Sequence, residues 1–147
     1  MSAPAFLRRL ERETCVRLKP SPIHGVGVFA VQSIKQHTDC FPRIRTDVET
    51  RFVAESELQA VQPETRRMIQ DFCLQRNEGG TTGRWVMTDG FAAMDMSFYL
   101  NAATGKNDAN VEMFNDPRSS MCCFRAKRDI AAGEELLFDY GRPASAV

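Results

Sequence analysis

The chain of 147 residues carries no excess charge of either sign, no long hydrophobic run and no internal repeat. Lysine and arginine together number 19, as do aspartate and glutamate, so the formal net charge is zero. A neutral chain has no general electrostatic attraction to nucleic acid or to anionic lipid. No stretch approaches the roughly 20 apolar residues that a membrane-spanning helix needs. We therefore expect neither direct nucleic-acid binding nor a membrane partner.

The cysteines lack the spacing of a disulfide framework or of a redox motif. No two of them have the C-x-x-C spacing, and residues 1–13 lack the apolar core of a secretory leader. An odd number of cysteines without a leader favours reduced thiols. We therefore expect an intracellular protein whose thiols are free. The cysteines are Cys15, Cys40, Cys73, Cys122 and Cys123.

Composition indicates one ordinary globular domain, because hydrophobic residues make up 43% and charged residues 26% of the chain. The charges are unevenly distributed: residues 85–141 hold nine acidic and five basic side chains. An acidic C-terminal part would suit a basic partner. A solvated surface explains the same pattern about as well.

Short strands dominate the predicted elements, and they do not alternate regularly with helices as in a parallel α/β fold. Helical signals are confined to residues 1–13, which form a short helix or a loosely docked arm, and to residues 51–83. Within the second range we expect a helix at 55–61 and another that begins at Pro63. The fold class is therefore mainly β with a small helical insert. Strands are expected at 15–19, 23–30, 40–48, 84–88, 110–114, 121–128 and 134–138, with a helical turn at 94–100 and a loop at 101–110.

Gly25 begins a Gly-Val-Gly-Val-Phe-Ala segment that fits the G-x-G-x-x-[G/A] pattern of dinucleotide-binding proteins. That pattern needs a strand before it and a helix that begins within it. Here two prolines precede the segment and β-branched residues follow the first glycine. A glycine turn that exposes its backbone to a ligand fits the residues better.

The last nine residues before the C-terminal tail, Gly133 to Gly141, have the sequence Gly-Glu-Glu-Leu-Leu-Phe-Asp-Tyr-Gly. Gly133 predicts a tight turn, and the following residues predict a short strand. Taken alone, the segment has two interpretations. It is either a structural strand with a half-buried Tyr140, or a strand that carries a catalytic tyrosine into a pocket.

Three segments together resemble the SET-domain lysine methyltransferases. That family has a glycine-x-glycine turn, then an R-F-I-N-H-S-C-x-P-N segment, then G-E-E-L-x-x-D-Y. The chain has Gly25-Val26-Gly27, then Ser-Phe-Tyr-Leu-Asn ending at Asn101 with Asn110 after it, then the segment from Gly133 to Gly141. The resemblance covers about residues 14–141, and the C-terminal motif is its most specific part.

This resemblance implies a SET-domain fold, in which several short β-sheets surround a C-terminal pseudoknot. Residues 14–141 would form a single SET domain with a variable helical insert at 51–83. Residues 1–13 would precede it as an arm or short helix, and residues 142–147 would follow as a tail.

The resemblance also implies a protein-lysine N-methyltransferase that uses S-adenosylmethionine and releases S-adenosylhomocysteine. The substrate would be a histone or another protein with a basic tail. The protein would act in the nucleus or on chromatin if the organism is eukaryotic, and in the cytoplasm otherwise. The alternative is a catalytically inactive SET-like protein-interaction module, and the sequence leaves a homodimer open.

The family motif assigns the catalytic position to Tyr140, whose hydroxyl would lie near the substrate amine and the transferred methyl group. Phe138 lies two residues earlier and therefore points the same way along the strand. With Tyr99 it would line the substrate channel, where phenylalanine leaves room for di- or trimethylation. The alternatives are a structural hydrogen bond for Tyr140 and a plain core position for Phe138.

Cofactor-binding positions carry over from all three segments. The glycine-x-glycine turn would present its backbone to the cofactor, and Asn101 would hold the methionine part. Ala102 replaces the family's histidine, so it offers backbone contacts but no side-chain hydrogen bond, which weakens binding. The predicted cofactor-binding residues are Gly25, Val26, Gly27, Asn101, Ala102 and Tyr140.

Thr104 replaces the family's zinc-binding cysteine, and the cysteine-rich tail that shares this zinc has no counterpart after Gly141. We therefore expect no zinc. We also expect that the N-terminal arm, a partner subunit or the substrate closes the site.

Overall fold

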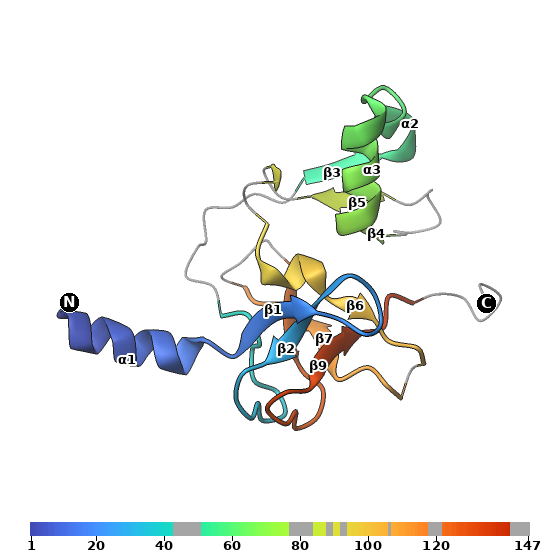
Figure 1. Ribbon diagram of the computed structural model, residues 1–147. Helices are drawn as coiled ribbons and strands as arrows, with labels where there is room; N and C mark the ends of the chain where they lie inside the picture. The colour runs from blue at the N-terminus through green and yellow to red at the C-terminus, as the bar shows by residue number, and fades with distance from the viewer. Residues whose placement is uncertain are drawn as a thin grey trace.

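Short strands form most of the regular structure in the computed structural model, which describes residues 1–42, 51–76, 84–87, 90–91, 94–105, 107–117 and 122–141. The helices are α1 (Ala3–Glu13), α2 (Glu55–Leu58), α3 (Pro63–Phe72) and the 3-10 helix η2 (Met96–Tyr99) (Figure 1). The strands are β1 (Val16–Pro20), β2 (Val26–Ala30), β3 (Arg51–Ala54), β4 (Leu74–Arg76), β5 (Arg84–Met87), β6 (Asn101–Ala102), β7 (Val111–Phe114), β8 (Cys123–Ala126) and β9 (Glu135–Phe138). The prediction of a mainly β chain is confirmed.

Strand β9, the last in the chain, lies in the middle of the main sheet rather than at its edge. The strand order is β1-β2-β9-β7-β8, and β6 also pairs with β9. β2 runs antiparallel to β9, whereas β6 and β7 run parallel to it. In Figure 1 the red β9 accordingly lies between the blue β2 and the orange β7. Distant parts of the chain therefore meet at β9.

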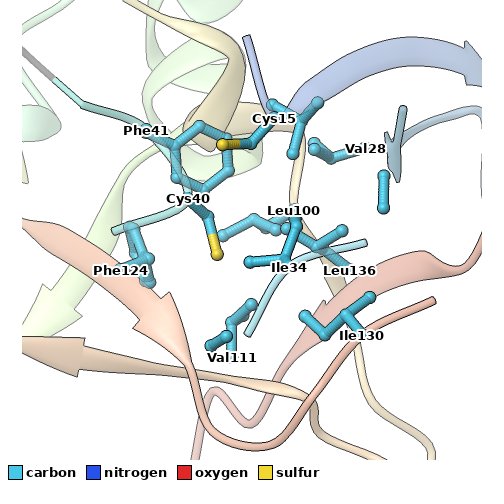
Figure 2. Close-up of a cluster of buried hydrophobic side chains, with 13 residues drawn as sticks. Cys15, Val28, Ile34, Cys40, Phe41, Leu100, Val111, Phe124, Ile130 and Leu136 are labelled. Atoms are coloured by element: carbon cyan, nitrogen blue, oxygen red, sulfur yellow. The ribbon is translucent and has the colours of Figure 1, made fainter. Parts of the chain in front are cut away.

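The hydrophobic core lies against this central strand. Leu136 of β9 and Val28 of β2 are opposite each other in the sheet, and both are completely buried. Figure 2 shows Val111 and Leu100 in the same cluster, which thus joins strands of the main sheet to the segment before β6. Leu137 and Phe138, the residues after Leu136, are only partly buried. The core therefore anchors β9 and leaves its C-terminal end near the surface.

Asn110 connects the main sheet through its side chain. It is 2% exposed, its Nδ2 donates to the Glu135 carbonyl at 2.8 Å, and its Oδ1 accepts from the Leu137 N–H at 2.7 Å. One buried amide thus pairs with a C=O and an N–H on the same edge of β9, as a neighbouring strand would. Buried backbone groups need such partners.

A smaller sheet of order β3-β5-β4 carries α2 and α3 above the main sheet in Figure 1. The Trp85 indole of β5 donates to the Glu55 carboxylate of α2 at 2.7 Å. Phe72 at the end of α3 contacts Tyr99 of η2, with ring centroids 5.5 Å apart. This aromatic pair connects the smaller sheet and its helices to the segment before β6.

Most predicted elements are present, with three differences. The helix from Pro63 is confirmed, but residues 51–83 also contain β3 and β4, which pair only through the later strand β5. Residues 101–110 were expected as a loop, yet Asn101–Ala102 forms β6 because β9 lies beside it. Residues 40–42 of the predicted strand 40–48 are irregular, and the remainder of that strand lies outside the described residues.

Helix α1 confirms the helical interpretation of the N-terminal residues. Ser2 caps it through the Ala5 N–H, and Pro4 lies in its first turn. None of its residues is buried, and Figure 1 shows it extending away from both sheets. Cys15, Cys40 and Cys73 are free thiols. No helix in the described part of the chain is long and apolar enough to span a membrane.

We predict that Asn110→Ala lowers the free energy of unfolding by roughly 2–4 kcal/mol, because it leaves a buried N–H and a buried C=O of β9 unpaired. Urea denaturation followed by circular dichroism measures this. Asn107→Ala is the matched control, since Asn107 is exposed and should change stability by less than about 0.5 kcal/mol. Equal stability of the two variants would contradict the role of Asn110 in joining the sheet.

Candidate active site around the end of the last strand

Tyr140 lies two residues after the last residue of β9, at the end that is not buried in the core. Its ring is 38% exposed, and its hydroxyl donates a hydrogen bond to the Leu100 carbonyl. Burial raises the pKa of Tyr140 to about 12. The side chain is therefore a neutral phenol at physiological pH, with its proton directed to a carbonyl and its oxygen lone pairs left to accept.

Phe138 lies between Tyr140 and the core. Its ring centroid is 4.8 Å from that of Tyr140 and 5.1 Å from that of Phe124, both with edge-to-face geometry. Phe41 extends this row of aromatic rings at 6.2 Å from Phe124. Phe138 and Tyr140 therefore lie on the same side of the chain, as period-two alternation predicts. Phe138 packs against the core and against Tyr140 at once.

The end of the 3-10 helix η2 and the residue after it, Tyr99 and Leu100, reach this region. Asp95 caps the helix by accepting from the Ser97 N–H at 2.9 Å. The turn ends with Tyr99, which packs against Phe72, and with Leu100, whose carbonyl accepts from Tyr140. Tyr99 therefore lies next to Leu100, whose carbonyl binds the Tyr140 hydroxyl, and two residues before Asn101.

Asn101 joins the site because β6 pairs with the end of β9. Asn101 is opposite Leu137 in the parallel pairing, and Ala102 is opposite Phe138. The Asn101 side chain is 9% exposed, and its Nδ2 donates to the His24 carbonyl at 2.9 Å and less closely, at 3.4 Å, to the Val26 carbonyl. The asparagine of the central motif therefore binds the backbone of the glycine turn.

The two glycines of that turn have different environments. Gly25 has a φ of +45°, and a side chain added there would meet no atom within 4 Å. A Cβ on Gly27 would instead lie 2.1 Å from Oε1 of Glu135. The side of Gly25 is open to a ligand, as is Val26, which is 44% exposed. Position 27 favours glycine because the Glu135 carboxylate occupies the space that a side chain would need.

Glu135 and Ser21 complete the arrangement, and the sequence interpretation missed both. Glu135 accepts from Nδ2 of Asn101 at 2.8 Å and from Oγ of Ser21 at 3.0 Å. A signal for Glu135 existed, because it belongs to the Gly-Glu-Glu-Leu motif that also contains Leu136. Ser21 follows a proline in an unremarkable loop, so nothing in the sequence indicated it.

The described residues leave a polar side-chain atom and an open turn available to a ligand. The three hydrogen bonds of the Asn101 side chain all use Nδ2, and its Oδ1 accepts none from the described residues. That oxygen is free to accept from an ammonium group. The open side of Gly25 and the exposed Val26 belong to the turn that Asn101 binds, and the rings of Phe138 and Tyr140 lie at the end of β9. Ala102 adds backbone groups only.

No group of three or more His, Cys, Asp or Glu side chains that could hold a metal ion occurs among the residues the structure describes. The absence of zinc itself stays a prediction.

Comparison with known proteins agrees with this geometry. No curated protein sequence matches the chain. Among solved structures, a Plasmodium falciparum protein proposed as a histone methyltransferase has a TM-score of 0.52 and 16% identity. The match covers 90% of this chain and 97% of the Plasmodium chain. CpSET8 of Cryptosporidium has a TM-score of 0.57 and 19% identity. The match covers 90% of this chain and 60% of the CpSET8 chain.

A third similar structure is a humanized mutant of the Chaetomium thermophilum Polycomb Repressive Complex 2 bound to the inhibitor GSK126. It has a TM-score of 0.53 and 28% identity over 86% of this chain, which spans only 15% of that longer chain. The SET domain family model matches residues 25–141, from the glycine turn to the end of the last motif. The chain therefore belongs to the SET-domain family.

Proposed function

We propose that this protein is a protein-lysine N-methyltransferase that uses S-adenosylmethionine. The observation that carries the proposal is the meeting of the three motifs at one place. Asn101 binds the glycine turn, and the Leu100 carbonyl immediately before it holds the hydroxyl of Tyr140. Residues from near the start, the middle and the end of the chain thus surround a single open surface.

The cofactor would supply an electrophilic methyl group. Gly25 and Val26 would receive it on open backbone, Asn101 would accept from its amino group, and Ala102 would contribute backbone contacts. The ring of Tyr140 would border the same space. The close packing of Glu135 against Gly27 leaves that glycine a supporting role behind this surface.

The substrate lysine must lose a proton before its nitrogen can attack, although its ordinary pKa is about 10.4. Removing water from around the amine favours its neutral form. The aromatic rings of Phe138, Tyr140 and Tyr99 would provide such surroundings. Tyr140 does not act as a base in this proposal, because its pKa of about 12 keeps it protonated. Its oxygen instead accepts from the amine and orients it for in-line attack.

We infer a substrate with a basic tail, such as a histone, from two observations. The Plasmodium protein with a similar fold is itself described as a proposed histone methyltransferase. Residues 85–141 also carry more acidic than basic side chains, which favours approach of a cationic peptide. In a eukaryotic cell such a substrate would place the protein on chromatin, and in other cells it would act in the cytoplasm.

Titration with S-adenosylhomocysteine by calorimetry tests the proposal most directly. We expect saturable binding with one site per chain, because the turn at Gly25 and the amide of Asn101 are already in place. No detectable binding at millimolar ligand would contradict the enzymatic proposal. It would favour an inactive interaction module instead.

Tyr140→Phe should lower kcat for methyl transfer to histone peptides by about 10²-fold, because the amine loses the group that orients it. Binding of S-adenosylhomocysteine should change little, since the ring stays. Transfer is measured with labelled cofactor, and circular dichroism checks the fold. Undiminished transfer would show that the hydroxyl serves only the Leu100 carbonyl.

Phe138→Tyr should shift the products toward monomethyl-lysine. The added hydroxyl occupies space beside Tyr140 and can hold a water molecule there, so less room remains for a methylated amine. Mass spectrometry of a peptide substrate measures the product ratio. If the wild-type protein already yields only monomethyl product, the proposed role of Phe138 is wrong.

A further inference from the structure

We propose that Glu135 is a positioning residue that orients the Asn101 amide and holds the glycine turn in place for the cofactor. The inference rests on the proposed function, because it concerns the affinity of that same site. The motif assigned no role to this glutamate. The structure makes its carboxylate the junction of all three segments that form the site.

Both carboxylate oxygens of Glu135 are used. Oε1 accepts from Nδ2 of Asn101 at 2.8 Å, and Oε2 accepts from Oγ of Ser21 at 3.0 Å. The Ser21 hydroxyl in turn accepts from the backbone N–H of Ile23 at 3.0 Å and of His24 at 3.3 Å. The carboxylate therefore connects β9 to β6 on one side and to the turn before β2 on the other.

This pattern determines which way the Asn101 amide faces. The carboxylate and the two carbonyls of His24 and Val26 can only accept, so the NH2 group of Asn101 must point toward them. Its oxygen is then directed away from Glu135. Of the three acceptors, the carboxylate is the charged one, and charge-assisted hydrogen bonds are the stronger kind.

Gly27 provides the space for this carboxylate. A Cβ there would be 2.1 Å from Oε1 and 2.9 Å from Cδ of Glu135. Gly27 does not have the positive φ that Gly25 has, so the backbone itself would accept alanine. The nearest obstacles to a side chain at Gly27 are Glu135 and, at 3.0 Å, Cβ of Ser21.

Glu134, the preceding residue, serves as a matched control. Its carboxylate pairs with Arg128 at 3.1 Å at the surface, with 37% of the Glu134 side chain exposed. Successive residues near a strand point to opposite faces, so the two glutamates of the motif have different environments. Removing the charge at Glu134 should leave the site unchanged.

Glu135→Ala should weaken S-adenosylhomocysteine binding by about tenfold or more, because the Asn101 amide loses its charged acceptor and the turn loses its contact through Ser21, so that only the two carbonyls still hold the amide. KM for the cofactor should rise by a similar factor, while kcat falls less than about threefold, because Tyr140 and Phe138 stay in place.

Glu135→Gln should recover most of the affinity. Its amide oxygen can still accept from Nδ2 of Asn101, which restores the contact that orients the amide, whereas the contact with Ser21 is lost because the lone pairs of that hydroxyl already accept from Ile23 and His24. Glu134→Gln should bind like the wild-type protein.

Calorimetry and steady-state kinetics at a temperature where every variant is folded decide between the outcomes. If the wild-type protein binds the ligand and Glu135→Ala binds it equally well, this inference is wrong and the proposed function stands. If kcat and KM change together without rescue by Glu135→Gln, the role is structural only, and the inference is also wrong. If the wild-type protein does not bind, the proposed function itself fails.

A double-mutant cycle tests the contact without any ligand. Gly27→Ala should lower the Tm clearly in the wild-type background and much less in Glu135→Ala, because the obstructing carboxylate is then absent. Equal losses of Tm in the two backgrounds would overturn the proposed contact between Gly27 and Glu135, whatever the binding experiments give.

Discussion

The site depends on the pairing of β9 with strands from other parts of the chain. A four-residue strand has little stability of its own, and its backbone groups need partners on both sides. β2 provides them on one side, and β6, β7 and the Asn110 side chain provide them on the other. Because these partners come from separate segments, the formation of β9 and the assembly of the site are the same event.

Alternation along β9 then places Leu136, Phe138 and Tyr140 on one side of the chain and Glu135 on the other. Leu136 is completely buried in the core. Glu135 faces the glycine turn, and Phe138 and Tyr140 place their rings together beyond the strand's end. The core side of the strand thus continues into the two aromatic rings of the site, and the opposite side carries the Glu135 carboxylate. The rigid sheet fixes the relative positions of Glu135, Phe138 and Tyr140. A site that acts by orienting bound reactants needs such fixed positions.

The sequence predicted those elements whose conformation depends on residues close together in the chain. Pro63 began a helix because its φ suits the first turn, and Gly133 formed a turn with a φ of +90°. The short strand at Asn101 could not be predicted, because only the neighbouring β9 makes it a strand. The contact of Gly27 with Glu135 was likewise hidden, because glycine in a sequence does not reveal which atom occupies the missing side chain's place. Residues 108 positions apart have no local pattern that relates them.

The alanines after Asn101 make its orientation more consequential. Where the family has histidine and serine, Ala102 and Ala103 carry no polar side-chain atoms, so β6 contributes one polar side chain to the site. An asparagine amide can present either its oxygen or its NH2 group, and only the groups behind it decide which. Here those groups are one carboxylate and two carbonyls. With fewer side-chain contacts to hold the cofactor, more of its recognition depends on this single amide, and so on Glu135 behind it.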